Sequence, residues 1–209
     1  MTTKIAVYNQ ALAHLGERKL ASLTEAREPR YKLDDQWTAA IRLCLERVLL
    51  NSSLRTVLID ASTSIEPAFG MRYAFPKPED WIRTLTVSDS DSLSLFEGWQ
   101  DEGGYWYADI DQLYVQFVSD HAEYGGDLGN WPETFAEYVA VCLARRVAPG
   151  LTASVEKQDY LFKLEKRFRV DARGMDAMNQ PVSRPPSGTW VRSRSTGAVV
   201  QPHPARSIT

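Results

Sequence analysis

Apolar residues near the N-terminal end of the chain recur at the spacing of amphipathic helices. The first stripe predicts a short helix over residues 3–16, in which Gly16 suits a left-handed C-terminal cap. Its members are Ile5, Tyr8, Leu12 and Leu15. Pro29 suits the first turn of a second helix, which reaches residues 51–53. Its stripe comprises Leu33, Trp37, Ile41, Cys44, Leu45 and Val48. Each stripe requires an apolar partner surface.

Two further helices are predicted on the C-terminal side. Pro132 opens the third helix and the Pro149-Gly150 pair ends it. Its stripe comprises Phe135, Val139, Cys142, Leu143 and Val147. The fourth helix begins after Thr152 or Ser154 as its N-terminal cap and runs towards Gly174. Its apolar stripe is Leu161, Leu164 and Phe168. The charged residues beside that stripe are interpreted as a solvated face.

Between the second and third helices the period of the pattern changes from 3.6 to 2. Residues 82–87 alternate apolar and polar side chains, and residues 113–118 are rich in β-branched and aromatic types. Gly103-Gly104 and Gly125-Gly126 are turn signals. This segment predicts a small antiparallel β insertion.

Helix pairs on both sides of a β insertion predict a mainly α fold, an antiparallel four-helix bundle with an inserted small antiparallel β wing and an extended C-terminal arm. We assign the bundle to residues 1–64 and 128–178, and the acidic, β-rich insertion to residues 65–127. From residue 179 the composition shifts to Pro, Ser, Gly, Arg and Thr, a mixture that does not form a core by itself. Residues 179–209 are therefore predicted to be an extended basic arm.

Charge is segregated along the chain, although the net charge of the 209 residues is only −3. Between Arg83 and Arg145 there are 12 acids and no Lys or Arg, whereas residues 179–209 hold four arginines and no acid. Such separation sets up long-range fields between segments or between subunits. A solvated acidic lobe and a disordered basic tail are the simpler interpretation. A basic nucleic-acid surface over the whole chain is disfavoured, because the sequence pI is about 5.7.

Two sets of residues are candidates for contact with partners. In the basic arm, Trp190 and Val191 are expected to act as apolar anchors on a partner or a neighbouring subunit. The charged contacts of that interface are expected from Arg184, Arg192, Arg194 and Arg206. In the acidic segment, an exposed acidic surface is expected from Asp109, Asp111 and Asp120.

Signatures of catalysis, cofactor binding and metal binding are missing from the sequence. The histidines lie far apart, and the Asp89–Asp91 and Asp109–Asp111 pairs have no further calcium ligands at the required spacing. Phosphate-binding, dinucleotide-binding and nucleophile-elbow motifs are also missing. Cys44 and Cys142 are interpreted as core thiols. We therefore predict no enzyme, no catalytic residue, no cofactor and no metal ligand.

Three segments resemble a known family. Residues 5–25 resemble the N-terminal helix of the head-to-tail adaptor proteins of tailed phages, the group of tail tubular protein A and the tail accessory factors in short-tailed phages. Residues 69–83 are similar to the family's aromatic-Pro-x-Pro-x-Asp-x-hydrophobic-Arg segment, and residues 135–152 resemble its alanine-rich third helix. The resemblance covers about residues 4–178. The family often has a Trp-x-Phe-Ala block where this chain reads Leu49-Leu-Asn-Ser-Ser-Leu-Arg55.

The resemblance implies a structural virion protein. Subunits of the family form a ring, typically dodecameric, that docks beneath the portal protein and extends the DNA channel towards the downstream nozzle or tube protein of the tail. Packaged DNA would pass without specific binding, and no membrane would be involved. On this interpretation, the acidic surface of Asp109, Asp111 and Asp120 would meet the next tail component or face the DNA channel. The expected location is the head-tail junction of the virion, after synthesis in the host cytoplasm, since the chain shows neither a secretory signal nor a long apolar run.

Two other functions stay open beside the adaptor. Carboxylates of the Glu97 to Asp111 region, such as Glu102, lie near aromatic residues and could serve a peptidoglycan-degrading hydrolase. The arginine-rich arm could belong to a nucleic-acid-binding module. The aromatic and proline residues between Tyr73 and Trp81 likewise allow two interpretations, a stiff crossing buried in the monomer or a contact between subunits.

Overall fold

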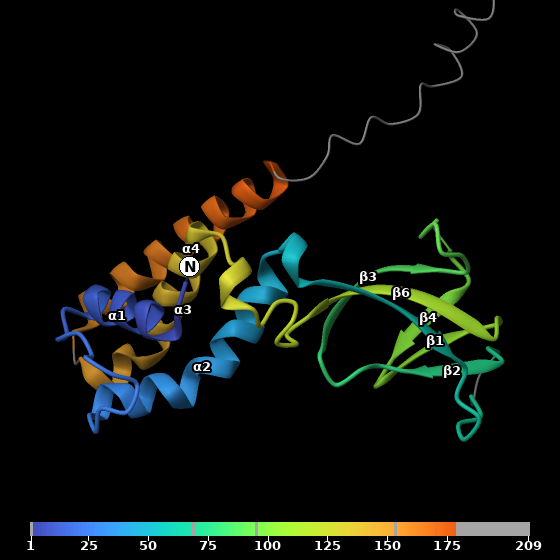
Figure 1. The fold of residues 1–209 in the computed structure, drawn as a ribbon, viewed down its shortest axis with the longest axis horizontal. Coiled ribbons are helices and arrows are strands. Elements are labelled where there is room, and N and C mark those ends of the chain that lie inside the picture. Colours follow the sequence, from blue (N-terminus) through green and yellow to red (C-terminus); the bar gives the residue numbers. More distant parts are fainter. Residues whose placement is uncertain (1, 68–69, 95, 153, 179–209) are drawn as a thin grey trace, which may run out of the picture. The chain divides into compact units, whose positions relative to one another are not determined.

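The computed structural model describes residues 2–67, 70–94, 96–152 and 154–178, and of residues 175–178 the backbone only (Figure 1). These residues all belong to one compact unit, Met1–Asn179. In this part of the chain four α-helices accompany two antiparallel three-stranded sheets, so that 46% is helical and 21% is strand. The protein is therefore mixed α/β.

The two N-terminal helices form where their local signals predict them. Helix α1 spans Lys4–Leu15, with the Thr3 hydroxyl accepting a hydrogen bond from the Ala6 amide. Gly16 ends it in the left-handed conformation, at φ 72° and ψ 21°. Helix α2 spans Glu28–Arg47, with proline in its first turn. It ends a few residues earlier than predicted.

The two C-terminal helices confirm the predicted order and differ in their ends. Helix α3 spans Glu133–Leu151 and continues past Pro149, which lies in its last turn. Helix α4 spans Val155–Met178, and the Ser154 hydroxyl accepts a hydrogen bond from the Lys157 amide at its start. Gly174 does not end α4, because the helix continues past it to Met178 and Gly174 does not adopt a positive φ.

Helix α3 is the centre of the helical core, since it packs against α1, α2 and α4. Eleven of its side chains are buried, among them Phe135, Val139 and Leu143 from the predicted stripe. Burying a Leu or Phe side chain contributes about 1.5–3 kcal/mol. The amphipathic stripes of the other helices cover α3 on separate faces, so none of the four is expected to be stable alone.

The β part is a sandwich of two sheets (Figure 1). One sheet has the order β1-β6-β3, from strands Leu54–Asp60, Gln112–Ser119 and Trp81–Ser88. The other has the order β2-β5-β4, from strands Tyr73–Pro76, Tyr105–Ala108 and Trp99–Glu102. Their inner faces share a second core that is separate from the helical one. It comprises Phe75, Val87, Trp106, Ala108, Leu113, Val115 and Phe117.

The predicted fold class, a mainly α four-helix bundle with a small β wing, is wrong. The β part is a two-sheet sandwich with its own core, and its first strand, Leu54–Asp60, lies inside the 1–64 range that was assigned to helix. Residues 82–87 and 113–118 are strands as expected, and so are the aromatic residues Tyr105 to Tyr107 beside the Gly103-Gly104 turn signal, but three strands were missed. Two of the missed strands have only four residues each, too few for a period-2 pattern to stand out. The predicted arm, 179–209, lies outside the described residues.

Both cysteines are free and buried, which confirms that they are core thiols. Cys44 of α2 and Cys142 of α3 lie in the helical core, and burial raises the pKa of the Cys44 thiol well above its usual range. None of the described helices combines the length and the apolar character that crossing a bilayer requires.

Candidate interaction surfaces

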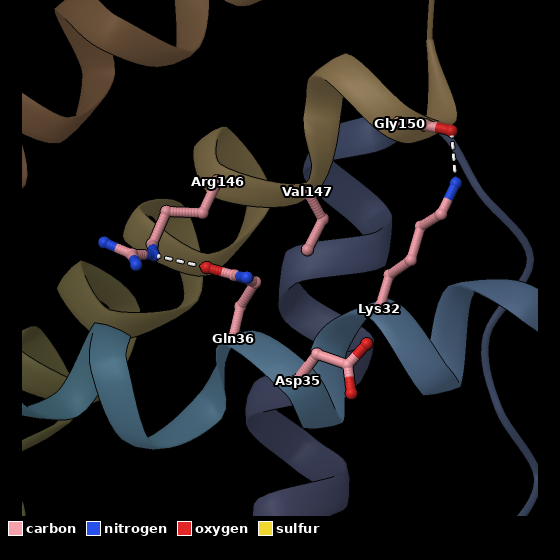
Figure 2. A pocket seen from close by; sticks show the side chains of 6 residues that line it. All are labelled: Lys32, Asp35, Gln36, Arg146, Val147 and Gly150. Carbon is pink, nitrogen blue, oxygen red and sulfur yellow. Dashed lines mark hydrogen bonds between the residues drawn. The ribbon is translucent and has the colours of Figure 1, made fainter.

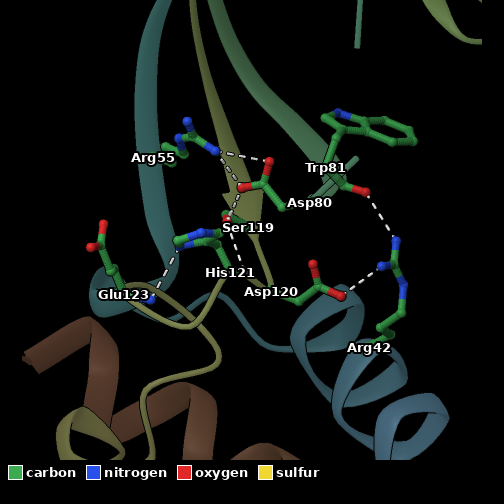
Figure 3. Close-up of polar contacts among 8 residues, drawn as sticks. All are labelled: Arg42, Arg55, Asp80, Trp81, Ser119, Asp120, His121 and Glu123. Atoms are coloured by element: carbon green, nitrogen blue, oxygen red, sulfur yellow. Dashed lines mark hydrogen bonds and ion pairs between the residues drawn. The ribbon is translucent and has the colours of Figure 1, made fainter. Parts of the chain in front are cut away.

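A polar junction joins the helical part to the sandwich (Figure 3). Arg42 of α2 donates to an Asp120 carboxylate oxygen at 2.6 Å and to the Trp81 carbonyl at 3.1 Å. Trp81 begins β3 and Asp120 follows β6, so one guanidinium holds α2 against two strand ends. The Arg42 side chain is 44% exposed, so the ion pair adds little stability by itself. Val118 of β6 also belongs to the helical core, so apolar packing joins the two parts as well. We infer that these contacts together hold the sandwich against the helices.

A second set of hydrogen bonds at the junction is centred on the Asp80 carboxylate (Figure 3). Arg55 of β1 donates to both Asp80 oxygens, at 2.9 and 2.8 Å, and the Ser119 hydroxyl donates to the same carboxylate. Burial alone would raise the pKa of Asp80. The hydrogen bonds from Ser119 and Arg55, together with the Arg55 charge, outweigh burial and hold that pKa below its usual value. Asp80 therefore links β1, β3 and β6 in its ionised form.

Replacing Asp80 by Asn is expected to lower the free energy of unfolding by about 2 kcal/mol at neutral pH, because the charged acceptor is lost. The folded-state pKa lies below the unfolded value of about 3.9, so the stabilisation is present above that pH. It is lost as the pH falls through the folded pKa. Urea denaturation of both proteins from neutral to acid pH should show their difference shrinking on acidification. Two results would contradict this role of Asp80: a difference in the free energy of unfolding that does not change with pH, or an equal loss of stability in the control Asp89→Asn, which changes an exposed carboxylate.

Gly125, in the loop after β6, is packed tightly at the junction. Its amide donates to the Ser119 carbonyl at 3.1 Å, and its carbonyl accepts from the Trp131 indole at 2.8 Å. A Cβ at this position would lie 2.8 Å from the Leu45 side chain and 3.1 Å from the Ser53 Cβ. The backbone is thus packed directly against α2 and the turn after it. Only glycine fits there without a shift of its neighbours.

The acids predicted to form one surface are in two places. Asp120 is at the junction, whereas Asp111 is at the opposite end of β6, about 25 Å away for an eight-residue strand. Asp109 lies near Asp111, and its carboxylate accepts a hydrogen bond from the Arg72 amide at 2.9 Å. Because Gln112 pairs with Asp60, the end of β1 is there too. We call this end of the sandwich, far from α2, the tip.

The arm residues predicted to contact a partner lie outside the described residues. They are Arg184, Trp190, Val191, Arg192, Arg194 and Arg206. Their role therefore stays a prediction from the sequence.

Two pockets in the described part of the chain are small for a substrate. One holds about 130 Å³ between α2 and α3, where Arg146 donates to Gln36 at 2.9 Å and Lys32 to the Gly150 carbonyl at 2.5 Å (Figure 2). The other holds about 220 Å³ beside the junction, next to Trp37 and Asp120. Typical ligand sites hold about 300–1,000 Å³.

The carboxylates considered for a hydrolase line neither of these pockets. Glu97, Asp101 and Glu102 are exposed on or beside the edge strand β4. Asp101 pairs with Lys77 at 2.5 Å, and the Lys77 ammonium also lies 4.0 Å from the centre of the Trp81 ring. Among the described residues, no group of three or more His, Cys, Asp or Glu side chains is arranged to hold a metal ion.

Sequence reasoning missed the junction and the exposed apolar side chains of α4. Arg42 and Asp120 are 78 residues apart, so no local pattern connects them. Phe162 and Val170 stand among charges that were interpreted as a solvated face. The spacing of Val155, Phe162 and Val170, by seven and then eight residues, was the available signal for a second apolar stripe. Comparison with known proteins adds no relative, since no family model and no curated protein matches the chain.

Proposed function

We propose that this chain is the subunit of a head-to-tail adaptor ring in a tailed phage, which docks under the portal and extends the DNA channel to the tail. The observation that carries the proposal is the family resemblance, which touches both halves of one compact unit. Its first segment occupies α1, its second leads through β2 into β3, and its third occupies α3. A resemblance confined to one helix would carry less weight.

The junction supports the proposal in physical terms. An adaptor contacts the portal on one side and the tail on the other, so its subunit needs two surfaces held at a fixed separation. The helical core and the sandwich core provide two such bodies, and Arg42 of α2 joins them through hydrogen bonds to Asp120 and the Trp81 carbonyl. The Arg55–Asp80 ion pair holds the strand ends together at the same place. The Pro-rich and Arg-rich sequence of the arm suits a contact with a partner at some distance, because Pro-rich sequences favour extended conformations.

The charge of the sandwich supports passage of DNA without specific binding. Acids outnumber bases in this region of the chain, and Glu97, Asp101 and Glu102 are exposed. Binding of DNA depends on Lys and Arg that neutralise phosphates. An acidic surface repels the duplex instead, which suits a channel wall or a contact with another protein.

Light scattering tests the proposal with the full chain and the portal ring of the virus that encodes it. At the micromolar concentrations of this experiment the chain is expected to be a monomer, which joins the portal in multiple copies and gives one species of defined mass. The portal surface is expected to promote assembly, because it holds bound subunits at a high local concentration and so favours contacts that are weak between free chains. A chain whose mass is unchanged by the portal at all mixing ratios would contradict the adaptor function.

A further inference from the structure

Helix α4 carries an unpartnered apolar stripe with a basic border. Val155, Phe162 and Val170 are 69%, 47% and 64% exposed, and they fall on one face with Lys166 because residues three, four, seven and eight apart are neighbours on a helix. The Lys166 ammonium lies 4.3 Å from the centre of the Phe162 ring. We define the α4 patch as Val155, Phe162, Lys163, Lys166 and Val170. Asp159 is an exposed acid on the same face, and the two lysines outnumber it. The opposite face, with Leu161 and Ala172, is buried against the other helices.

The tip of the sandwich carries apolar side chains with an acidic border. Leu58 and Tyr73 are 49% and 37% exposed. Leu58 shares the outer face of β1 with Asp60, since the neighbouring Val57 and Ile59 pack on the sandwich core. Tyr73 shares the face of Phe75 on β2 and therefore lies on another side of the tip, where it pairs with Ala108, the neighbour of Asp109. We define the tip patch as the residues around this end of the sandwich, Leu58, Asp60, Tyr73, Asp109 and Asp111. Arg72 is an exposed base at this end, and the acids outnumber it.

These two patches account for most of the exposed large apolar side chains in the described part of the chain. The full set is Leu23, Tyr31, Leu58, Tyr73, Val155, Tyr160, Phe162 and Val170. Exposed apolar groups that gather within a charged border mark sites of protein contact. One border is cationic and the other anionic, so the patches are complementary in charge as well as in their apolar centres.

We propose that the α4 patch of one subunit binds the tip patch of a neighbouring copy of this chain. Such a head-to-tail contact uses two different surfaces, as a closed ring requires. The chain's own arm is a poorer occupant of the α4 patch, because residues 179–209 hold four arginines and no acid. The proposal deepens the adaptor function, on which it rests for the ring. In this contact, Asp109 and Asp111 face the α4 patch of a neighbouring subunit instead of the tail component or the DNA channel.

Charge reversal on each patch tests the contact in the full chain without portal. The α4 variant carries Lys163→Glu and Lys166→Glu, and the tip variant carries Asp60→Lys and Asp111→Lys. Sedimentation equilibrium is expected to show that wild-type self-association weakens at high salt. Each variant alone should associate at least about tenfold more weakly, because like charges then face each other. An equimolar mixture of the two variants should recover association, since each reversed patch meets a complementary one.

A control matched to the α4 variant replaces two bases by two acids outside both patches, with Arg18→Glu and Lys19→Glu in the loop between α1 and α2. This control should associate as the wild type does. Three results would overturn the contact. The first is a wild-type chain that stays monomeric up to about 0.5 mM, well above the Kd of most specific interfaces. The second is an equimolar mixture of the two variants that does not recover association, and the third is a tip variant that associates as the wild type does. The last result would point to pairing between two α4 helices. None of them affects portal docking, so failure here differs from failure of the adaptor function.

Discussion

Deletion of residues 180–209 is expected to abolish docking on the portal while leaving the remaining chain folded. The compact unit ends at Asn179, and both hydrophobic cores lie within it, so the deletion removes no core residue. It does remove the predicted anchors Trp190 and Val191 and a local charge of +4. Trp and Arg are the residue types that dominate binding energy at protein interfaces. We expect the affinity for the portal to fall at least about a hundredfold.

The measurement is light scattering of the truncated chain with the portal ring, with circular dichroism to verify folding. Truncation after Arg206 is the matched control, because it keeps all six predicted contact residues. That control should dock as the full chain does. Undiminished docking of the chain that ends at residue 179 would show that the arm is not the portal contact.

The substitution Gly125→Ala is expected to destabilise the protein by about 3 kcal/mol, the upper part of the range for overpacking. The added Cβ would meet the Ser119 carbonyl, the Leu45 side chain and Ser53 at distances shorter than ordinary van der Waals contact. The Ser119 carbonyl and the Ser53 Cβ cannot move aside easily, because the first is backbone and the second belongs to a buried residue in the turn after α2. The loop must shift, which strains the hydrogen bond from Trp131 to Gly125.

Thermal unfolding provides the measurement. A loss of about 3 kcal/mol corresponds to a fall in Tm of about 6 to 12 °C for a protein of this size. Gly104→Ala is the matched control, because a Cβ there meets nothing within 4 Å. Its effect should stay within about 0.5 kcal/mol. Equal melting temperatures for the two variants would contradict the close packing described at the junction.

The helices could be predicted because their signals are local. Gly16 ends α1, proline opens α2, and Ser154 caps α4, each within a few residues of the stripe it delimits.

Strand β1 could not be predicted from a local pattern. Its inward positions include Arg55 and its outward positions include Leu58, so the alternation of apolar and polar residues is broken at both faces. Arg55 is tolerated inside because Asp80, 25 residues away, accepts its hydrogen bonds.

The candidate surfaces were less accessible to sequence reasoning than the helices. Asp109 and Asp111 were singled out for their charge, and the structure brings them to one tip with Leu58 and Tyr73. Asp120 was grouped with them although its partner Arg42 holds it at the other end of β6. Charge along a sequence does not reveal which end of a strand each residue occupies. That assignment depends on strand register, which is set by pairing between distant segments.

Electron cryo-microscopy of the head-tail junction in the virus that encodes this chain tests the central claim most directly. The account predicts a ring of repeated copies between the portal and the tail, in which each copy shows four helices beside a six-stranded sandwich. Helices and sheets of these lengths are recognisable in such a map by their spacing. A junction built entirely from other folds, in particles that lack this chain, would contradict the adaptor function.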